Sequence, residues 1–151
     1  MENNEKRNDV LNGLVEINND RIEGYQKAAQ ETDASDLKSL FSKMAADSTN
    51  FRNELTAEIQ RTGGTPAEGT TVSGKFYRAW MDVKAALSGK DRHAVLSSCE
   101  FGEDAALDAY EEALKDDALK TSPFKAKVEL QRSEIKKSHD QIKSLRDSIV
   151  A

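Results

Sequence analysis

Cysteine, proline, glycine and long hydrophobic runs are all scarce in this sequence. Among 151 residues there is one cysteine, Cys99, so neither an internal disulfide nor a cysteine-built zinc site holds the fold together. Two prolines and eight glycines leave few enforced breaks in regular backbone. No stretch approaches the roughly 18 consecutive apolar residues that a membrane-spanning helix needs. We therefore expect a soluble cytoplasmic protein of one domain, stabilised by core packing.

An excess of basic side chains is also missing. The chain has 22 Lys and Arg against 27 Asp and Glu, a formal net charge of −5. Nucleic-acid binders carry a basic domain or stripe, so we expect no nucleic-acid partner, and the absence of an apolar span predicts no membrane partner. What is abundant is Ala, Glu, Asp, Lys and Leu, which are common in helices. The composition predicts an all-α protein.

Apolar residues recur every three or four positions in four long segments, the spacing of a buried helix face. These segments span about 8–30, 33–61, 91–116 and 122–149, and a shorter one spans 74–88. Gly63 and Gly64 are predicted to end the second segment, Ser73 to cap the short one, and Ser122 and Pro123 to begin the last. The apolar positions are Leu11, Leu14, Ile22, Tyr25 and Ala29, then Leu37, Phe41, Met44, Phe51, Leu55 and Ile59, then Leu96, Cys99, Ala106, Tyr110 and Ala113, and finally Phe124, Val128, Ile135, Ile142, Leu145 and Ile149.

The lengths of the connections predict the topology. The first two long helices, and the last two, are joined by short connections and are expected to be antiparallel. The middle connection, about 62–90, is long enough to cross the whole bundle. The prediction is a single ferritin-like four-helix bundle over 1–151, with two antiparallel helical hairpins joined by a long crossover that contains a short extra helix. Phe76, Tyr77 and Trp80 are expected to pack this short helix against the bundle.

Polar residues interrupt each apolar stripe near the middle of its helix. A carboxylate at such a position needs a partner for its charge, and Glu103 keeps strict register with Leu96 and Tyr110. We expect a folded bundle to gather the interruptions into one interior polar layer. Its predicted members are Asn18, Ser48, Glu103, Lys136 and Ser138.

The layer resembles an incomplete di-iron site. In ferritin-like di-iron proteins the first helix of each hairpin supplies a Glu and the second a Glu-x-x-His motif. The corresponding residues here are Asn18 with Asp47-x-x-Asn50, and Glu103 with Lys136-x-x-His139. A lysine among the ligands repels metal cations, so we expect no functional di-iron centre and no cofactor. Lys136 is instead expected to reach Glu103 or Asp47 and neutralise it.

Two alternatives keep a binding role for this layer. One is a mononuclear site for iron, manganese or zinc, with Glu103, His139 and Asp47 as ligands. A strict heptad count weighs against this site. It places Ser48 and Ser138 in the core and leaves Asp47 and His139 beside the core. The other is a small-molecule pocket lined by Asn18, Tyr25, Glu103 and Tyr110. Cys99 occupies a core position, where a packed and inert thiol is expected.

Three segments carry a family resemblance. They run from Gly74 to Trp80, from Cys99 to Asp104 with Tyr110, and from His139 to Asp147. They resemble an uncharacterised bacterial family of ferritin-like four-helix-bundle proteins, which is distantly similar to rubrerythrin and bacterioferritin. In the uncharacterised family an arginine is typical at the position where this chain has Phe101. The resemblance implies the fold. With the incomplete ligand set, it leads us to expect a non-catalytic, stress-associated or structural protein that acts through its surface, with an unidentified protein partner or as a homo-oligomer.

Overall fold

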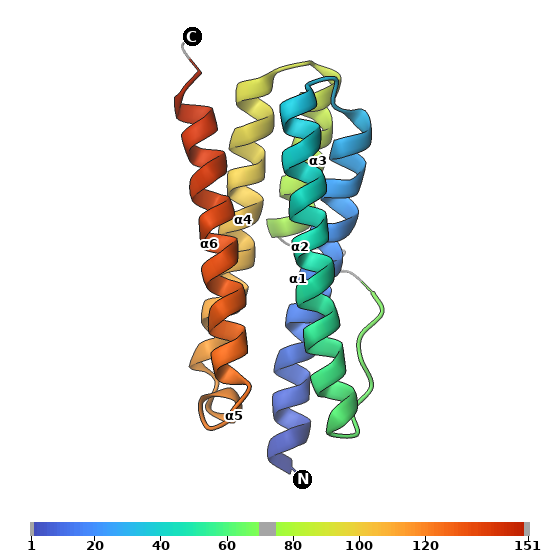
Figure 1. Cartoon of the computed structure of the whole chain (residues 1–151), viewed down its shortest axis with the longest axis vertical. Coiled ribbons are helices and arrows are strands. Elements are labelled where there is room, and N and C mark those ends of the chain that lie inside the picture. The colour runs from blue at the N-terminus through green and yellow to red at the C-terminus, as the bar shows by residue number, and fades with distance from the viewer. Residues whose placement is uncertain (1, 70–74, 150–151) are drawn as a thin grey trace.

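The structure is a computed structural model that describes residues 2–69 and 75–149, with side chains described for 4–69 and 80–149. Four long helices lie side by side (Figure 1), and two shorter ones follow the second and third of them in the chain. The helices are α1 (Glu2–Glu31), α2 (Ser35–Arg61), α3 (Lys75–Ser88), α4 (Arg92–Lys115), α5 (Asp117–Lys120) and α6 (Lys125–Asp147). The described ranges contain no strand, which confirms the all-α prediction. None of these helices is both long and apolar enough to cross a membrane.

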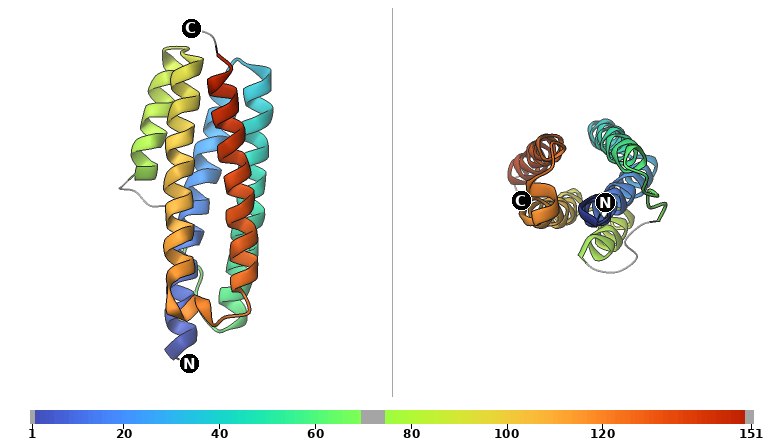
Figure 2. Two further views of the ribbon diagram at one scale, coloured as in Figure 1. Left: turned by 90° about the vertical axis from the view of Figure 1, so that its left-hand side faces the viewer. Right: turned by 90° about the horizontal axis from the view of Figure 1, so that it is seen from below.

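The long helices form two antiparallel pairs, α1 with α2 and α4 with α6 (Figures 1 and 2). Residues 62–69, after α2, travel back along the molecule, and α3 runs in the same direction. As a result α2 and α4 run the same way, and the chain order of directions is up, down, down, up. The expected crossover between two hairpins is therefore present.

Two glycines end α2 as the sequence predicts. Gly63 has φ +82°, a left-handed conformation that side chains other than glycine rarely adopt. Its N–H donates to the carbonyl of Gln60 at 3.0 Å, and the N–H of Gly64 donates to that of Ile59 at 2.9 Å. These two bonds satisfy carbonyls that the end of a helix leaves without partners.

Several helix ends differ from the sequence prediction. α1 begins at Glu2 rather than near Asn8, and α6 begins at Lys125 rather than at 122. The hydroxyl of Ser122 accepts the N–H of Phe124 at 3.2 Å, so Ser122 holds a turn just before the helix. The single turn α5 was not predicted. Asp116 caps it by accepting the N–H of Ala118 at 2.9 Å, and its Leu119 is fully buried.

The core divides into two apolar clusters along the bundle axis. One is built on residues that include Leu11, Leu14, Phe51, Leu55, Tyr110 and Ile135. The other includes Phe41, Met44, Leu96, Cys99 and Ile142. Between the two clusters, each of the four long helices has a stretch that belongs to neither, at about 18–24, 46–50, 100–104 and 136–141. Four of the predicted polar-layer residues, Asn18, Ser48, Glu103 and Ser138, are buried in these stretches.

Helix α3 packs on the outside of the bundle against α1 and α4, as the end-on view in Figure 2 shows. Val83 is buried in this contact and Trp80 lies against Gly24. A β-carbon at Gly24 would stand 3.2 Å from Cε3 of Trp80, so the absence of a side chain permits this approach. The expected cap Ser73 and the side chains of Phe76 and Tyr77 lie outside the described residues.

Candidate functional site

A fully buried arginine lies at the centre of the polar layer. Nη2 of Arg21 on α1 donates to both carboxylate oxygens of Glu103 on α4, at 2.9 and 3.2 Å, and Nε donates to Oε1 at 3.3 Å. Its Nη1 donates to the hydroxyl of Ser48 on α2 at 2.5 Å. All three residues have 0% exposure. The buried charge of Glu103 is thus neutralised by an ion pair that joins the two hairpins.

Tyr25 completes the surroundings of this ion pair. Its hydroxyl donates to Oε1 of Glu103 at 2.5 Å, and its ring lies 5.6 Å from the Arg21 guanidinium carbon and stacks on Phe41. Burial, and then the negative charge of Glu103, raise the pKa of Tyr25 well above its ordinary value, so the phenol stays protonated. Burial opposes the charge of Arg21, but the attraction of Glu103 outweighs it and the pKa of Arg21 is raised.

A second chain of hydrogen bonds lies beside the ion pair. Nδ2 of Asn18 donates to the Leu14 carbonyl and to the Tyr110 hydroxyl, both at 2.9 Å. Tyr110 donates to Oε1 of Gln131 at 2.6 Å, and Nε2 of Gln131 donates to the Phe51 carbonyl at 3.3 Å. Buried polar groups of α1, α4, α6 and α2 are thereby linked to one another.

Most of the predicted polar layer is buried, with one correction. Its buried members are Asn18, Ser48, Glu103 and Ser138. Lys136 does not belong to the layer: it is exposed, and its Nζ donates to Asp140 at 2.8 Å. That bond, followed by the contact with His139, lowers the pKa of Asp140. The neutralising role expected of Lys136 belongs to Arg21, because Arg21 stands on the inward face of its helix and Lys136 on the outward face.

The three predicted metal ligands have separate partners. Glu103 is bonded to Arg21 and Tyr25, while Asp47 is partly exposed and accepts from Lys43 at 2.9 Å. His139 faces Asp104 at 2.8 Å. One group of three metal-ligating side chains with ligand atoms within 4.8 Å of one another occurs in the described part of the chain, and it consists of Glu100, Asp104 and His139.

Both ring nitrogens of His139 face carboxylates. Nε2 lies 2.8 Å from Oδ1 of Asp104 and 3.6 Å from Oε1 of Glu100, both on α4. Nδ1 lies 3.0 Å from Oδ1 of Asp140, the next residue on α6. The second oxygen of Glu100 accepts from Arg146, also on α6. This cluster lies at the contact between α4 and α6, and His139 is the one predicted metal ligand in it.

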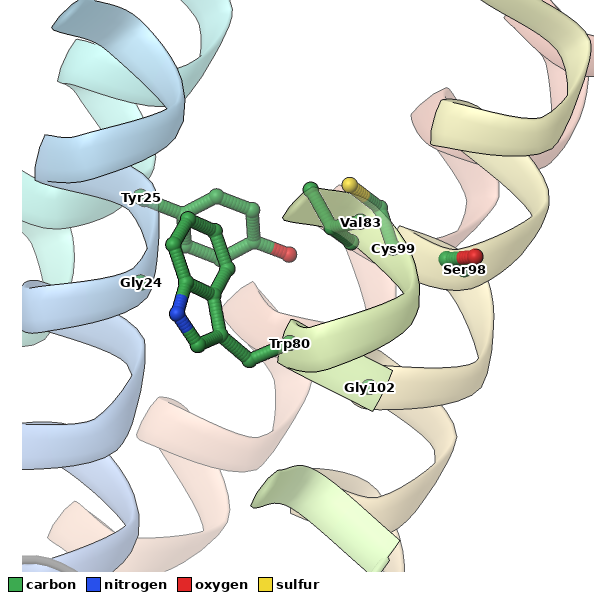
Figure 3. A pocket seen from close by; sticks show the side chains of 7 residues that line it. All are labelled: Gly24, Tyr25, Trp80, Val83, Ser98, Cys99 and Gly102. Atoms are coloured by element: carbon green, nitrogen blue, oxygen red, sulfur yellow. The ribbon is translucent and has the colours of Figure 1, made fainter. Parts of the chain in front are cut away.

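A small pocket lies between α1, α3 and α4 (Figure 3), with room for about one water molecule in its 20 Å³. Its lining residues are Gly24, Tyr25, Trp80, Val83, Ser98, Cys99 and Gly102. Of the four residues expected to line a small-molecule pocket, this one has only Tyr25. Cys99 is buried, and burial together with the nearby charge of Glu103 raises the pKa of its thiol, which keeps it protonated and unreactive.

Residues 6–116 match the family described as "Domain of unknown function (DUF2383)". The chain belongs to this family. The match covers most of α1 and all of α2, α3 and α4, so it contains Arg21, Ser48 and Glu103. It ends before α6 and does not cover the expected resemblance at 139–147. The description of DUF2383 assigns no activity, and no curated protein matches the chain.

Proposed function

We propose that this DUF2383 protein is a non-catalytic, ferritin-like bundle that serves as a stress-associated structural or interaction protein in the cytoplasm. In this proposal its interior ion pair occupies the level at which ferritin-like di-iron proteins hold metal, and its surface carries the function, through a protein partner or a second copy. The observation that carries the proposal is the buried contact between Arg21 and Glu103.

The ion pair argues against a metal at Glu103. Oε1 of Glu103 already accepts from Arg21 and Tyr25, and Oε2 accepts from Arg21. A divalent cation at this carboxylate would stand beside a guanidinium of like charge. Moving the guanidinium aside would leave Arg21 buried without a counterion, which is costly.

The polar layer also lacks the access that catalysis needs. Arg21, Ser48 and Glu103 have 0% exposure, and their polar groups bond to one another. A general acid or base must come within hydrogen-bond reach of its substrate. We therefore assign the layer a structural role and look to exposed residues for the function.

A variant without interior charges tests the proposal. Arg21→Met combined with Glu103→Leu keeps side chains of similar size, and such replacements of buried ion pairs are often tolerated. In a strain of the source organism that lacks the gene, we expect this variant to restore survival under oxidative and starvation stress as the unchanged protein does. A variant that melts like the unchanged protein but fails to restore survival would show that the interior chemistry is functional.

The alternative is a metal-binding ferritin-like protein that uses Glu103, His139 and Asp47 with iron, manganese or zinc. The protein is incubated with these ions, loose metal is removed, and the bound metal is measured. This measurement distinguishes the proposal from the alternative. The proposal predicts that Glu103→Ala retains as much metal as the unchanged protein. Metal lost in Glu103→Ala and in Asp47→Ala, with the fold intact, favours the alternative.

A further inference from the structure

We infer that Glu100, Asp104 and His139 bind one first-row divalent metal ion, with Zn²⁺ as the reference case. The inference goes beyond the proposed function, because this cluster lies at the α4–α6 seam rather than in the interior layer. Either one can fail without the other.

The spacing of the three side chains suits a metal ion. Glu100 and Asp104 are four residues apart on α4 and therefore lie on one face of the helix, opposite His139 on α6. Tetrahedral coordination with bonds of 2.0–2.2 Å places ligand atoms about 3.4 Å apart. The separations of Nε2 from Asp104 and Glu100, 2.8 and 3.6 Å, lie on either side of this value.

The surroundings of the imidazole call for a cation. A neutral imidazole has one N–H, yet a carboxylate oxygen lies 3.0 Å from Nδ1 and another 2.8 Å from Nε2. If Nδ1 donates to Asp140, the lone pair of Nε2 points at the carboxylates of Asp104 and Glu100, and this contact is repulsive. A metal ion on Nε2 turns the repulsion into shared coordination. A second proton on the ring is the competing occupant.

Two neighbours hold the ligands as metal sites require. A metal-binding histidine almost always donates its other N–H to a carboxylate, carbonyl or water, and Asp140 is placed to accept it. Arg146 bonds to Oε2 of Glu100, which leaves Oε1 turned toward the imidazole. The two carboxylate ligands balance a divalent charge, and the neighbouring cations Lys136 and Arg146 are each paired with an aspartate, Asp140 and Asp147.

Exposure gives the ion a way in. The Asp104 side chain is 56% exposed, whereas those of His139 and Glu100 are 11% and 15% exposed. The solvent side is thus open for entry and for water as the remaining ligand. One imidazole and two carboxylates suit Zn²⁺, Mn²⁺ or Fe²⁺, and the absence of sulfur from the set disfavours Cu⁺.

Calorimetric titration of the full chain tests the site. The protein is stripped of metal with a chelator and titrated with Zn²⁺ near neutral pH, beside His139→Gln, Asp104→Asn and the matched control His93→Gln. His93 is an exposed histidine of the same helix as the carboxylates. Circular dichroism verifies that each variant is folded.

We expect one Zn²⁺ per chain, at least tenfold weaker binding in His139→Gln and Asp104→Asn, and unchanged binding in His93→Gln. Asp140→Asn is expected to weaken binding about 10-fold, as loss of an outer partner does. Zn²⁺ should raise the melting temperature of the unchanged protein and of His93→Gln but not of His139→Gln. Equal binding by His139→Gln, or no binding by the unchanged protein, overturns the inference.

Discussion

Removing one partner of a buried ion pair leaves the other charge without compensation. Because Arg21 and Glu103 have 0% exposure, we expect Arg21→Met to lower the free energy of unfolding by about 3–5 kcal/mol. Adding Glu103→Leu should recover most of this loss, since no unpaired charge then remains. Urea unfolding of the two variants measures both effects.

Lys136→Met is the control for this experiment. Lys136 is exposed and its pair with Asp140 is a surface ion pair, so the expected change is within about 1 kcal/mol. If Lys136→Met destabilised the protein as much as Arg21→Met, the assignment of the buried charge to Arg21 would be wrong.

Tyr25 predicts a response to alkaline pH. Its pKa is raised in the folded state, so the stability that it contributes is present below its unfolded pKa of about 10 and is lost as the pH rises above it. The stability advantage of the unchanged protein over Tyr25→Phe should shrink by up to about 1.4 kcal/mol per pH unit above pH 10. Urea unfolding at pH 8 and pH 11 measures this difference, and an equal difference at both values would contradict the assignment.

The sequence pattern indicates that Arg21 is buried, although arginine is usually an exposed residue. Arg21 follows Leu14 by seven residues and precedes Ala28 by seven, which are positions on one buried heptad face. Arginine is almost never fully buried unless paired, so sequence reasoning assigns it to the surface. Glu103 was predictable because it interrupts an obvious stripe. Its partner depends on which helices become neighbours, and that is decided only in the folded chain.

At the scale of helices, two glycines of α1 predict opposite results. A β-carbon at Gly13 meets nothing within 4 Å, and Gly13 is exposed, so Gly13→Ala should stabilise the protein by about 1 kcal/mol through helix propensity. At Gly24 the new methyl group meets the Trp80 ring at 3.2 Å. We therefore expect Gly24→Ala to give no increase in stability and to displace α3.

Thermal melts and the emission of the single tryptophan check this pair of variants. Gly24→Ala should shift the emission of Trp80, and Gly13→Ala should leave it unchanged. The prediction of α3 contact with α1 fails if both variants gain equal stability and neither moves the emission.

Helix existence and pairing were predictable here, whereas several helix ends were not. The apolar repeat located α2, α3 and α4 to within a few residues, since burial of one face decides whether a segment is helical. The ends depend on local hydrogen bonds. Ser122 bonds to Phe124 in a turn before α6, and Asp116 starts the extra turn α5. Short polar residues suit both turns and caps, so sequence alone does not distinguish them.

Across the whole molecule, Arg7 joins three distant segments. This residue has 4% exposure, and its Nη1 donates to Glu58 at 2.7 Å and contacts Ser122 at 3.4 Å, while Nη2 donates to Thr62 at 2.9 Å. It thereby ties the start of α1 to the end of α2 and to the second hairpin. The hydrogen bond from Arg61, followed by the charge of Arg7, lowers the pKa of Glu58 against the effect of its partial burial.

The lowered pKa of Glu58 predicts part of the stability that the protein loses in acid. Because the folded pKa of Glu58 lies below its unfolded value of about 4.3, its contribution is present above that pH and is lost as the pH falls through the folded pKa. The stability advantage of the unchanged protein over Glu58→Gln should therefore diminish between pH 7 and pH 3. Urea unfolding at the two pH values tests this, and a constant advantage would count against it.

The bonds from Arg21 to Glu103 and from Asn18 to Tyr110 both cross from one hairpin to the other. If the hairpins dock one helical turn out of place, about 5.4 Å, Arg21 and Glu103 enter the core apart from each other. The apolar stripes tolerate such a slip better, because their residues recur every three or four positions, which is about one turn. We expect misaligned hairpins to dissociate before they pack fully, so that refolding shows no long-lived misaligned intermediate. A slow refolding phase that Arg21→Met removes would contradict this expectation. The buried pair then acts during folding as a check on alignment that rejects errors.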